Sequence, residues 1–480
     1  MLNINRIKKK FHPDHSRVII KPNIPKEEDR VKRIIARVLN LSEEEAKQIL
    51  DRVIASFANR HKNIWDAFDK NYNEIKSYIS PALQVSNNKK ALLGAYFSSE
   101  YSIQAAAFFN PSIIAHPDQS NLPEGSLRFI LSFRSVGEGH ISSIEFRSGA
   151  VDKNCNFTFD KVSQYSERAK IVNNPVYDKA TFFLKLSEMH KPENIISQKV
   201  SDLLSDKFLL SDLIEALIIV INSEHKAIGE NIMWLAKSNY ELEFKCDQEL
   251  SEKIIFPASQ NDSNGLEDAR FVRFVDDDDQ ITYYATYTAY NGHRILPQIL
   301  ETQDFQTFKM ITLNGKFSKN KGMALFPRKI DGQYMMISRV DGENLYVMSS
   351  DNIHFWHNAK LLKEPENQWE FVQVGNCGSP LETDKGWILL THGVGAMREY
   401  CIGIILLDLE DPGKIIGTMV EPLLMPAEDE REGYVPNVVY SCGAIIHKDN
   451  LIIPYAMSDT CSGIVTLSVS ELFKNIKKRK

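Results

Sequence analysis

The sequence predicts a mainly β protein that carries an α-helical N-terminal extension and a helical insertion between its β segments. Three observations predict this. Short runs of alternating apolar and polar residues fill most of the chain after residue 92, Asn-Gly and Asp-Gly turns separate them, and two other regions show helical periodicity. Many short strands divided by such turns are typical of a sandwich, a barrel or a propeller.

The N-terminal extension is predicted from the spacing of apolar residues. Between residues 26 and 79, apolar side chains recur every three or four positions, as in Val31–Val38. Ser42 and Glu45 form a capping box that opens a second helix, because each side chain can bond the other's backbone N–H. A third helix is predicted over Ile64–Tyr78.

The β segments lie on both sides of the helical insertion, which we place at about residues 175–238. The clearest predicted strands are Leu127–Phe133, Phe271–Phe274, Ile281–Tyr287 and Gln333–Ser338. The predicted turns lie at Asn291-Gly292, Asn314-Gly315, Asp331-Gly332 and Asp341-Gly342. The expected domains are residues 1–92, the helical extension, and residues 93–480, the catalytic domain with its insertion.

Composition restricts the partners and the compartment. The 480 residues carry a net charge of −6, whereas a nucleic-acid or anionic membrane surface normally needs a basic excess. No stretch has the length of a signal peptide's apolar region or of a membrane span, and the six cysteines show no CxxC pair. The sequence therefore predicts a cytoplasmic protein that binds neither nucleic acid nor membrane, and it shows no metal-ligand spacing.

Five segments combine charged and small polar residues beside predicted strands. They are Asn110–Gly149, Gly265–Arg270, Lys319–Arg339, Gly375–Tyr400 and Gly433–Gly443. A tight turn needs only Gly or Asn, so this excess polarity indicates a binding site. A propeller would bring such loops together at one mouth of its central channel, where distant segments could line a single pocket.

The order of these motifs resembles glycoside hydrolase family 130. NPS and HPDQ come first, followed by GLEDAR, ALFPRK, a GW and HG pair, DLEDP and YVPNVVYSCG. The helical extension is similar to that of the longer members, such as β-1,2-oligomannan phosphorylases. The resemblance implies a five-bladed β-propeller and inverting phosphorolysis of β-mannosides, with β-1,2-oligomannosides expected. Inorganic phosphate would be the co-substrate, α-mannose 1-phosphate the product, and no cofactor would be needed.

The same resemblance implies roles for individual residues. An inverting reaction needs an acid for the leaving oxygen, and Asp268 matches the family's acid, which donates through a hydroxyl of the bound mannose. A phosphate nucleophile is an anion and needs a cationic site. The implied phosphate-binding residues are Lys321, Arg339, His392 and Tyr400. The expected substrate-binding residues are Asn110, Asp118, Arg134, His140, Arg270, Asn437 and Asp459.

Two departures from the family pattern leave other functions open. Lys321 stands where the phosphorylases have an arginine, and Glu382 aligns with a phosphate-binding lysine. A carboxylate there would repel phosphate, so Glu382 is an alternative base that activates water in an inverting β-mannosidase, and Glu267 is a second candidate for that base. The other interpretation is that Lys385, not Glu382, corresponds to the family's lysine. A β-mannosyl transferase and a non-catalytic sugar-binding propeller are further alternatives, and the helical segments leave a homo-oligomer open.

Overall fold

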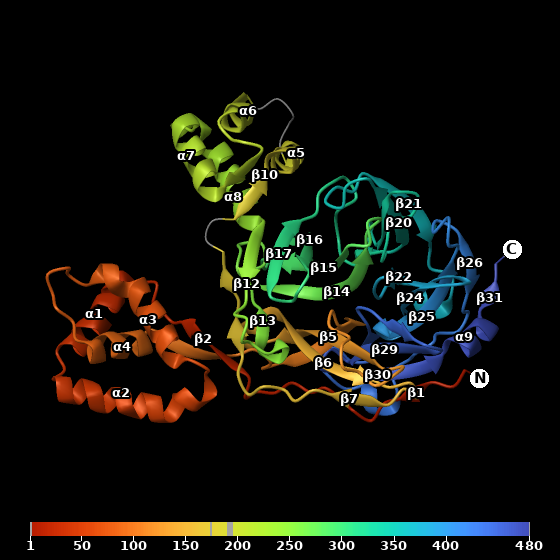
Figure 1. Ribbon diagram of the computed structural model, residues 1–480, viewed down its shortest axis with the longest axis horizontal. Coiled ribbons are helices and arrows are strands. Elements are labelled where there is room, and N and C mark those ends of the chain that lie inside the picture. The colour runs from red at the N-terminus through yellow and green to blue at the C-terminus, as the bar shows by residue number, and fades with distance from the viewer. Residues whose placement is uncertain (1, 173–174, 190–194, 480) are drawn as a thin grey trace.

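Most of the chain folds into antiparallel β-sheet, and two separate groups of helices attach to this β body (Figure 1). The structure is a computed structural model, and it describes residues 2–172, 175–189 and 195–479. The prediction of a mainly β protein with additional helices is confirmed. No helix within these ranges is long and apolar enough to cross a membrane.

The first helical group forms its own apolar core beside the β body (Figure 1). Its helices are α1 (Glu28–Leu39), α2 (Glu43–Phe57), α3 (Ile64–Ile75) and α4 (Asn87–Tyr96). The predicted capping box opens α2, since Ser42 Oγ accepts from Glu45 N at 3.1 Å and Glu45 Oε2 accepts from Ser42 N at 2.7 Å. The two-stranded antiparallel sheet of β2 (Val18–Pro22) and β3 (Ser98–Ser102) joins this group to the β body.

The second helical group is the insertion. It contains α5 (Lys179–Met189), α6 (Ile195–Asp202), α7 (Leu210–Val220), α8 (Lys226–Ser238) and the two-stranded antiparallel sheet of β10 (Val176–Asp178) and β11 (Lys207–Leu209). It rests on the β body through Lys185, whose Nζ donates to the Thr312 carbonyl at 2.8 Å. Burial lowers the pKa of Lys185 to about 7.

Within the described ranges, the long strands fall into five groups. The first two belong to one sheet: β4 (Ala107–Ala115), β5 (Leu127–Val136), β6 (Ser142–Val151) and β7 (Phe157–Phe159), then β14 (Gly265–Val275), β15 (Ile281–Tyr290), β16 (Ile295–Thr302) and β17 (Thr307–Thr312). At their edges lie β8 (Glu167–Arg168), β9 (Lys170–Ile171), β12 (Tyr240–Glu243) and β13 (Lys253–Ile255). Gly265 pairs with Ser142 where the two groups meet, and a Cβ on Gly265 would lie 2.7 Å from Ser142.

The other three groups follow along the chain. The third contains β18 (Ala324–Leu325), β19 (Tyr334–Ser338), β20 (Leu345–Ser350) and β21 (Asn358–Lys363). The fourth contains β22 (Gln373–Asn376), β23 (Leu381–Thr383), β24 (Gly386–Val394), β25 (Tyr400–Leu407), β26 (Ile415–Thr418) and β31 (Lys477–Lys478). The fifth contains β27 (Val439–Tyr440), β28 (Ile445–His447), β29 (Asn450–Met457), β30 (Cys461–Ser468) and β1 (Asn5–Arg6), and α9 (Val469–Asn475) follows it.

Each strand group packs against the next through a buried apolar cluster. Such clusters lie between groups one and two, two and three, three and four, and four and five. Another joins group five back to group one, through β29, β30, β4 and β5. Inner strands therefore bury both faces: in β5, Ile130 faces the second group, while Phe129 and Leu131 face the fifth.

Candidate active site

Two β-bulges place polar side chains side by side where β4 and β14 run together. Asn110 lies at a register shift of β4 with φ 48°, and Asp268 lies at a register shift of β14 with φ 56°. Bulges bend a strand and redirect a side chain, and positive φ is an uncommon conformation that clusters at functional sites. His140, Asn437 and Asp459 also have positive φ.

Asp268 is part of a network of charged side chains. Its Oδ1 accepts from Asn110 Nδ2 at 2.7 Å and from Arg134 Nη1 at 3.3 Å. Arg134 Nη2 also donates to Glu267 at 2.8 Å, and Lys321 Nζ donates to the other oxygen of Glu267 at 2.6 Å. Two carboxylates are thus held between two cations, and the amide of Asn110 orients the one at the bulge.

The charge state of Asp268 follows from this network. Burial by itself would raise its pKa, but the neighbouring cations, Arg134 first, outweigh burial and lower the pKa to about 2. Without a ligand, Asp268 is therefore ionised at neutral pH.

Arg270 fixes the backbone beside Asp268. Its Nη1 donates to the Asp268 carbonyl at 3.0 Å, its Nε to Cys377 O at 3.1 Å and its Nη2 to Tyr440 Oη at 2.5 Å.

A second cluster consists of Tyr440, His392, Tyr400 and Arg339. The Tyr440 ring centroid lies 4.9 Å from that of His392, and the His392 ring is stacked on Tyr400 with a centroid distance of 5.9 Å. His392 Nε2 lies 3.3 Å from Arg339 Nη1. Burial, followed by repulsion from Arg339 and Arg270, lowers the pKa of His392 well below its usual value, so the imidazole is neutral.

This second cluster contains buried polar atoms that lack a partner. Within the described part of the chain, these include Arg339 Nε and both amide atoms of Asn376. Gly322, next to Lys321, lies against both residues: its Cβ position would be 3.6 Å from Asn376 Oδ1 and 3.7 Å from Arg339 Cβ. Unpaired buried donors cost free energy unless a ligand satisfies them. Donors that lie close to the cations Arg339 and Arg270 suit an anion.

Asp459 is the second carboxyl group of the site that differs from its usual state. Burial, followed by repulsion from the Asp268 carboxylate, raises the pKa of Asp459 to about 6, although Arg134 and Arg398 oppose the shift. The two aspartates of one site thus have pKa values about four units apart. Such divergence is typical of acid–base sites.

The state of Asp459 predicts a pH-dependent stability. A pKa that is higher in the folded protein than the ordinary 3.8 means that the protonated form stabilises the fold at low pH. We expect this contribution to disappear as pH rises through about 6, a loss of about 2–3 kcal/mol for a shift of this size. Melting temperatures of wild type and Asp459→Asn should therefore diverge between pH 4 and 7, in favour of the variant at the higher pH. A constant difference would contradict this.

Other predicted residues lie at the rim. The His140 ring lies 5.5 Å from the exposed Tyr434 ring, and Tyr434 N donates to Thr460 Oγ1 at 3.0 Å, next to Asp459. The Asn437 carbonyl accepts from Tyr400 N at 3.0 Å, so it borders the second cluster.

Two predicted residues lie away from this site, and a third lies in it with a different role. Asp118 is paired with Arg128 at 2.9 Å on an exposed loop. Glu382 pairs with Arg328 at 2.7 Å and lies opposite Trp387 of β24. Trp387 is five residues from His392 on that strand, which places the two residues roughly 17 Å apart. All three guanidinium nitrogens of Arg270 donate to protein acceptors, so it is a supporting residue.

The structure also adds residues that sequence reasoning did not select. Asn376 and Tyr440 were missed, although both lie inside the polar segments noted above. Glu267 was considered only as a base, and its contacts instead make it the anion that holds Arg134 and Lys321. Contacts between strands that are distant in the chain leave no local signal in the sequence, so Asn376 and Tyr440 could not be found from it. The adjacent Glu and Asp of GLEDAR are such a signal, because they mark a charged site.

Several known proteins are similar to this chain. The profile of glycoside hydrolase family 130, described as beta-1,4-mannooligosaccharide phosphorylase, matches residues 212–478. A 1,2-beta-oligomannan phosphorylase of Thermoanaerobacter sp. (strain X514) is 34% identical over 230 residues, 46% of this chain and 75% of the relative. A beta-1,2-mannobiose phosphorylase of Listeria innocua is 28% identical over 236 residues, 48% of this chain and 65% of the relative.

A solved structure is also similar. The beta-1,2-mannobiose phosphorylase from Listeria innocua, in complex with beta-1,2-mannobiose, has a TM-score of 0.47 and 19% identity, and the match covers 78% of this chain and 92% of that chain. Among the described residues, no group of three or more His, Cys, Asp or Glu side chains is arranged to hold a metal ion. The family profile covers more than half of the 480 residues, and the chain belongs to glycoside hydrolase family 130.

Proposed function

We propose that this protein is an inverting phosphorylase of β-mannosides, with β-1,2-oligomannosides as its substrates. The observation that carries the proposal is the pairing of two neighbouring clusters: a carboxyl group at a bulge, and a group of side chains around Arg339 with unpaired buried donors. An anionic nucleophile needs cations and hydrogen-bond donors, and no base. The names of the relatives supply the sugar and the linkage.

The proposed reaction balances without any further reactant. An oxygen of phosphate attacks the anomeric carbon from the face opposite the leaving group, and the glycosidic C–O bond breaks. Asp268 supplies a proton to the leaving oxygen through a mannose hydroxyl, so the shortened sugar leaves as an alcohol and α-mannose 1-phosphate forms. The proton that hydrogen phosphate loses in forming the product replaces the one that Asp268 gave up. Arg339, Lys321 and the hydrogen-bond donors of the second cluster hold the phosphate.

Binding of phosphate explains how Asp268 obtains its proton. In the free protein the surrounding cations keep its pKa at about 2. A phosphate dianion bound beside Lys321 and Arg339 offsets those cations and adds a negative charge nearby, and both changes raise the pKa of Asp268. The Asp268 carboxyl group therefore takes up a proton more readily when phosphate is bound, which couples the two substrates.

The hydrolase alternative depends on Glu382, and its contacts allow a direct test. The Glu382 side chain is 43% exposed and that of its partner Arg328 is 38% exposed. Such exposed ion pairs contribute at most about 1 kcal/mol to the stability of the fold. We expect Glu382→Gln to change the rate of phosphorolysis by less than about twofold and the melting temperature only slightly. Loss of activity by a hundredfold would instead make Glu382 a catalytic residue.

The five strand groups support a five-bladed propeller. Each group packs on the next, the last packs on the first, and β1 adds the N-terminal strand to the fifth group through the pairs Asn5–Thr466 and Arg6–Val465. On this reading the domains lie close to the predicted boundaries, residues 1–92 for the helical extension and residues 93–480 for the catalytic domain. There are two exceptions: β1 belongs to the fifth strand group, and α4 continues to Tyr96. We also infer a cytoplasmic location, which the six free thiols support.

Product analysis tests the function directly. The purified protein is incubated with β-1,2-mannobiose and β-1,2-mannotriose, with and without inorganic phosphate, and mannose 1-phosphate and free mannose are quantified. We expect mannose 1-phosphate that depends on phosphate. Free mannose formed equally well without phosphate would establish hydrolysis and reject the proposal.

A further inference from the structure

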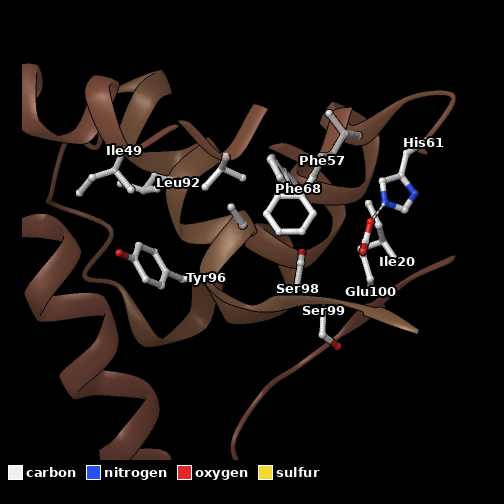
Figure 2. Close-up of a pocket in the computed structure, with 13 residues that line it drawn as sticks. Ile20, Ile49, Phe57, His61, Phe68, Leu92, Tyr96, Ser98, Ser99 and Glu100 are labelled. Atoms are coloured by element: carbon white, nitrogen blue, oxygen red, sulfur yellow. Dashed lines mark hydrogen bonds and ion pairs between the residues drawn. The ribbon is translucent and has the colours of Figure 1, made fainter. Parts of the chain in front are cut away.

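A partly open cavity of about 280 Å³ lies in the helical extension, away from the site described above, and two of its wall residues, Phe57 and Tyr96, are 40% and 49% exposed (Figure 2). Its walls come from α2, α3, α4 and the two-stranded sheet of β2 and β3. They are mostly apolar and include three aromatic side chains, those of Phe57, Phe68 and Tyr96. The cavity is thus formed entirely by the segment that the proposed chemistry leaves without a role.

One end of the cavity is polar. His61 Nε2 lies 2.8 Å from Glu100 Oε1, and Arg60 Nη1 donates to Glu100 Oε2 at 2.6 Å. The side chains of His61 and Glu100 are 7% and 19% exposed. A carboxylate has about four acceptor positions, so this one retains capacity for a donor after two contacts. An anionic head group would be repelled by Glu100, and a cationic one would compete with Arg60.

We propose that this cavity is a regulatory site for a small uncharged aromatic alcohol or phenol. A dry cavity of about 150 Å³ accommodates benzene, so 280 Å³ holds one ring with a short substituent. The aromatic walls offer edge and face contacts to the ring. The hydroxyl group donates to Glu100 at the polar end.

The strand that carries Glu100 links the cavity to the active-site rim. The next residue, Tyr101, donates its hydroxyl to the Glu138 carbonyl at 2.8 Å. Gly137, at the start of the same loop, packs directly against the Tyr101 ring. This loop carries His140, whose ring contacts Tyr434 beside the mannose side of the site. A ligand that repositions Glu100 therefore acts on the rim through β3.

Calorimetry on the full chain with 4-ethylphenol tests the site. Ala95 lines the cavity from α4, and Ala95→Leu fills part of the volume. Ala55→Leu makes the same change on the exposed face of α2 and is the matched control. We expect binding to wild type and to Ala55→Leu, and at least tenfold weaker binding to Ala95→Leu. The proposal is overturned if wild type does not bind at millimolar concentration, or if Ala95→Leu binds equally well.

Two further measurements test the polar end and the link. Ethylbenzene lacks the hydroxyl and should bind at least fivefold more weakly than 4-ethylphenol; equal affinity would contradict the contact with Glu100. Saturating 4-ethylphenol should change kcat/KM for β-1,2-mannobiose at least twofold in wild type but not in Tyr101→Phe, which still binds. Binding without any change in wild type would reject regulation. Calorimetry decides the site even if the proposed phosphorolysis is not found.

Discussion

Replacement of Asp268 by Asn should abolish phosphorolysis while leaving sugar binding largely intact. The amide keeps the shape of the side chain and can still contact Asn110, but it cannot carry the proton to the leaving oxygen. Removal of a general acid typically costs about 10²–10⁴-fold in rate, and we expect a loss of about 10³-fold in kcat. Initial rates of mannose 1-phosphate release, with calorimetric binding of β-1,2-mannobiose, measure both properties.

Asp276→Asn is the matched control for this variant. Asp276 follows β14 directly and pairs with Lys329 at 2.7 Å in a turn outside the charged network. The same change of chemistry there should leave the rate within about twofold, as expected for a surface ion pair. If Asp268→Asn kept more than a tenth of the wild-type rate, Asp268 would not be the acid. Asp459, with its raised pKa, would then be the next candidate.

Replacement of Arg339 by Gln should weaken the use of phosphate selectively. Hydrogen bonds to charged groups contribute about 1.5–3 kcal/mol, which predicts a rise of about 10–100-fold in the KM for phosphate. The KM for β-1,2-mannobiose should change by less than about threefold, because Arg339 lies with His392 and Tyr400, apart from Asn110 and Arg134. Arg339→Lys keeps the charge but not the planar fork, and should fall in between.

Arg328→Gln controls for the loss of an arginine. Arg328 lies in the third strand group and pairs with Glu382 at an exposed position. We expect both KM values to stay near those of wild type. If Arg339→Gln raised both KM values equally, or left the phosphate KM unchanged, the second cluster would not be the phosphate site. The reverse reaction gives an independent reading, since the KM for mannose 1-phosphate should rise as well.

Local features of the fold could be read from the sequence. The capping box at Ser42 and Glu45, the helical spacing in α1 and the short apolar run in β5 each depend on residues a few positions apart. Helix and strand periods are fixed by backbone geometry, so these patterns translate directly into structure. The position of GLEDAR in a strand that carries a bulge was not predictable, because a bulge depends on the register of the partner strand.

The sequence by itself determined the element types, the order of the polar motifs and their resemblance to the family. Only the tertiary structure decided which of those residues meet. It placed Lys321 against Glu267, brought Asn376 beside Arg339, and moved Glu382 to the other end of β24, next to Arg328. Charge interactions fall off with distance and depend on burial, so the state of Asp268 is set by Arg134 and Lys321, more than fifty positions away in the chain, together with the nearby Arg270.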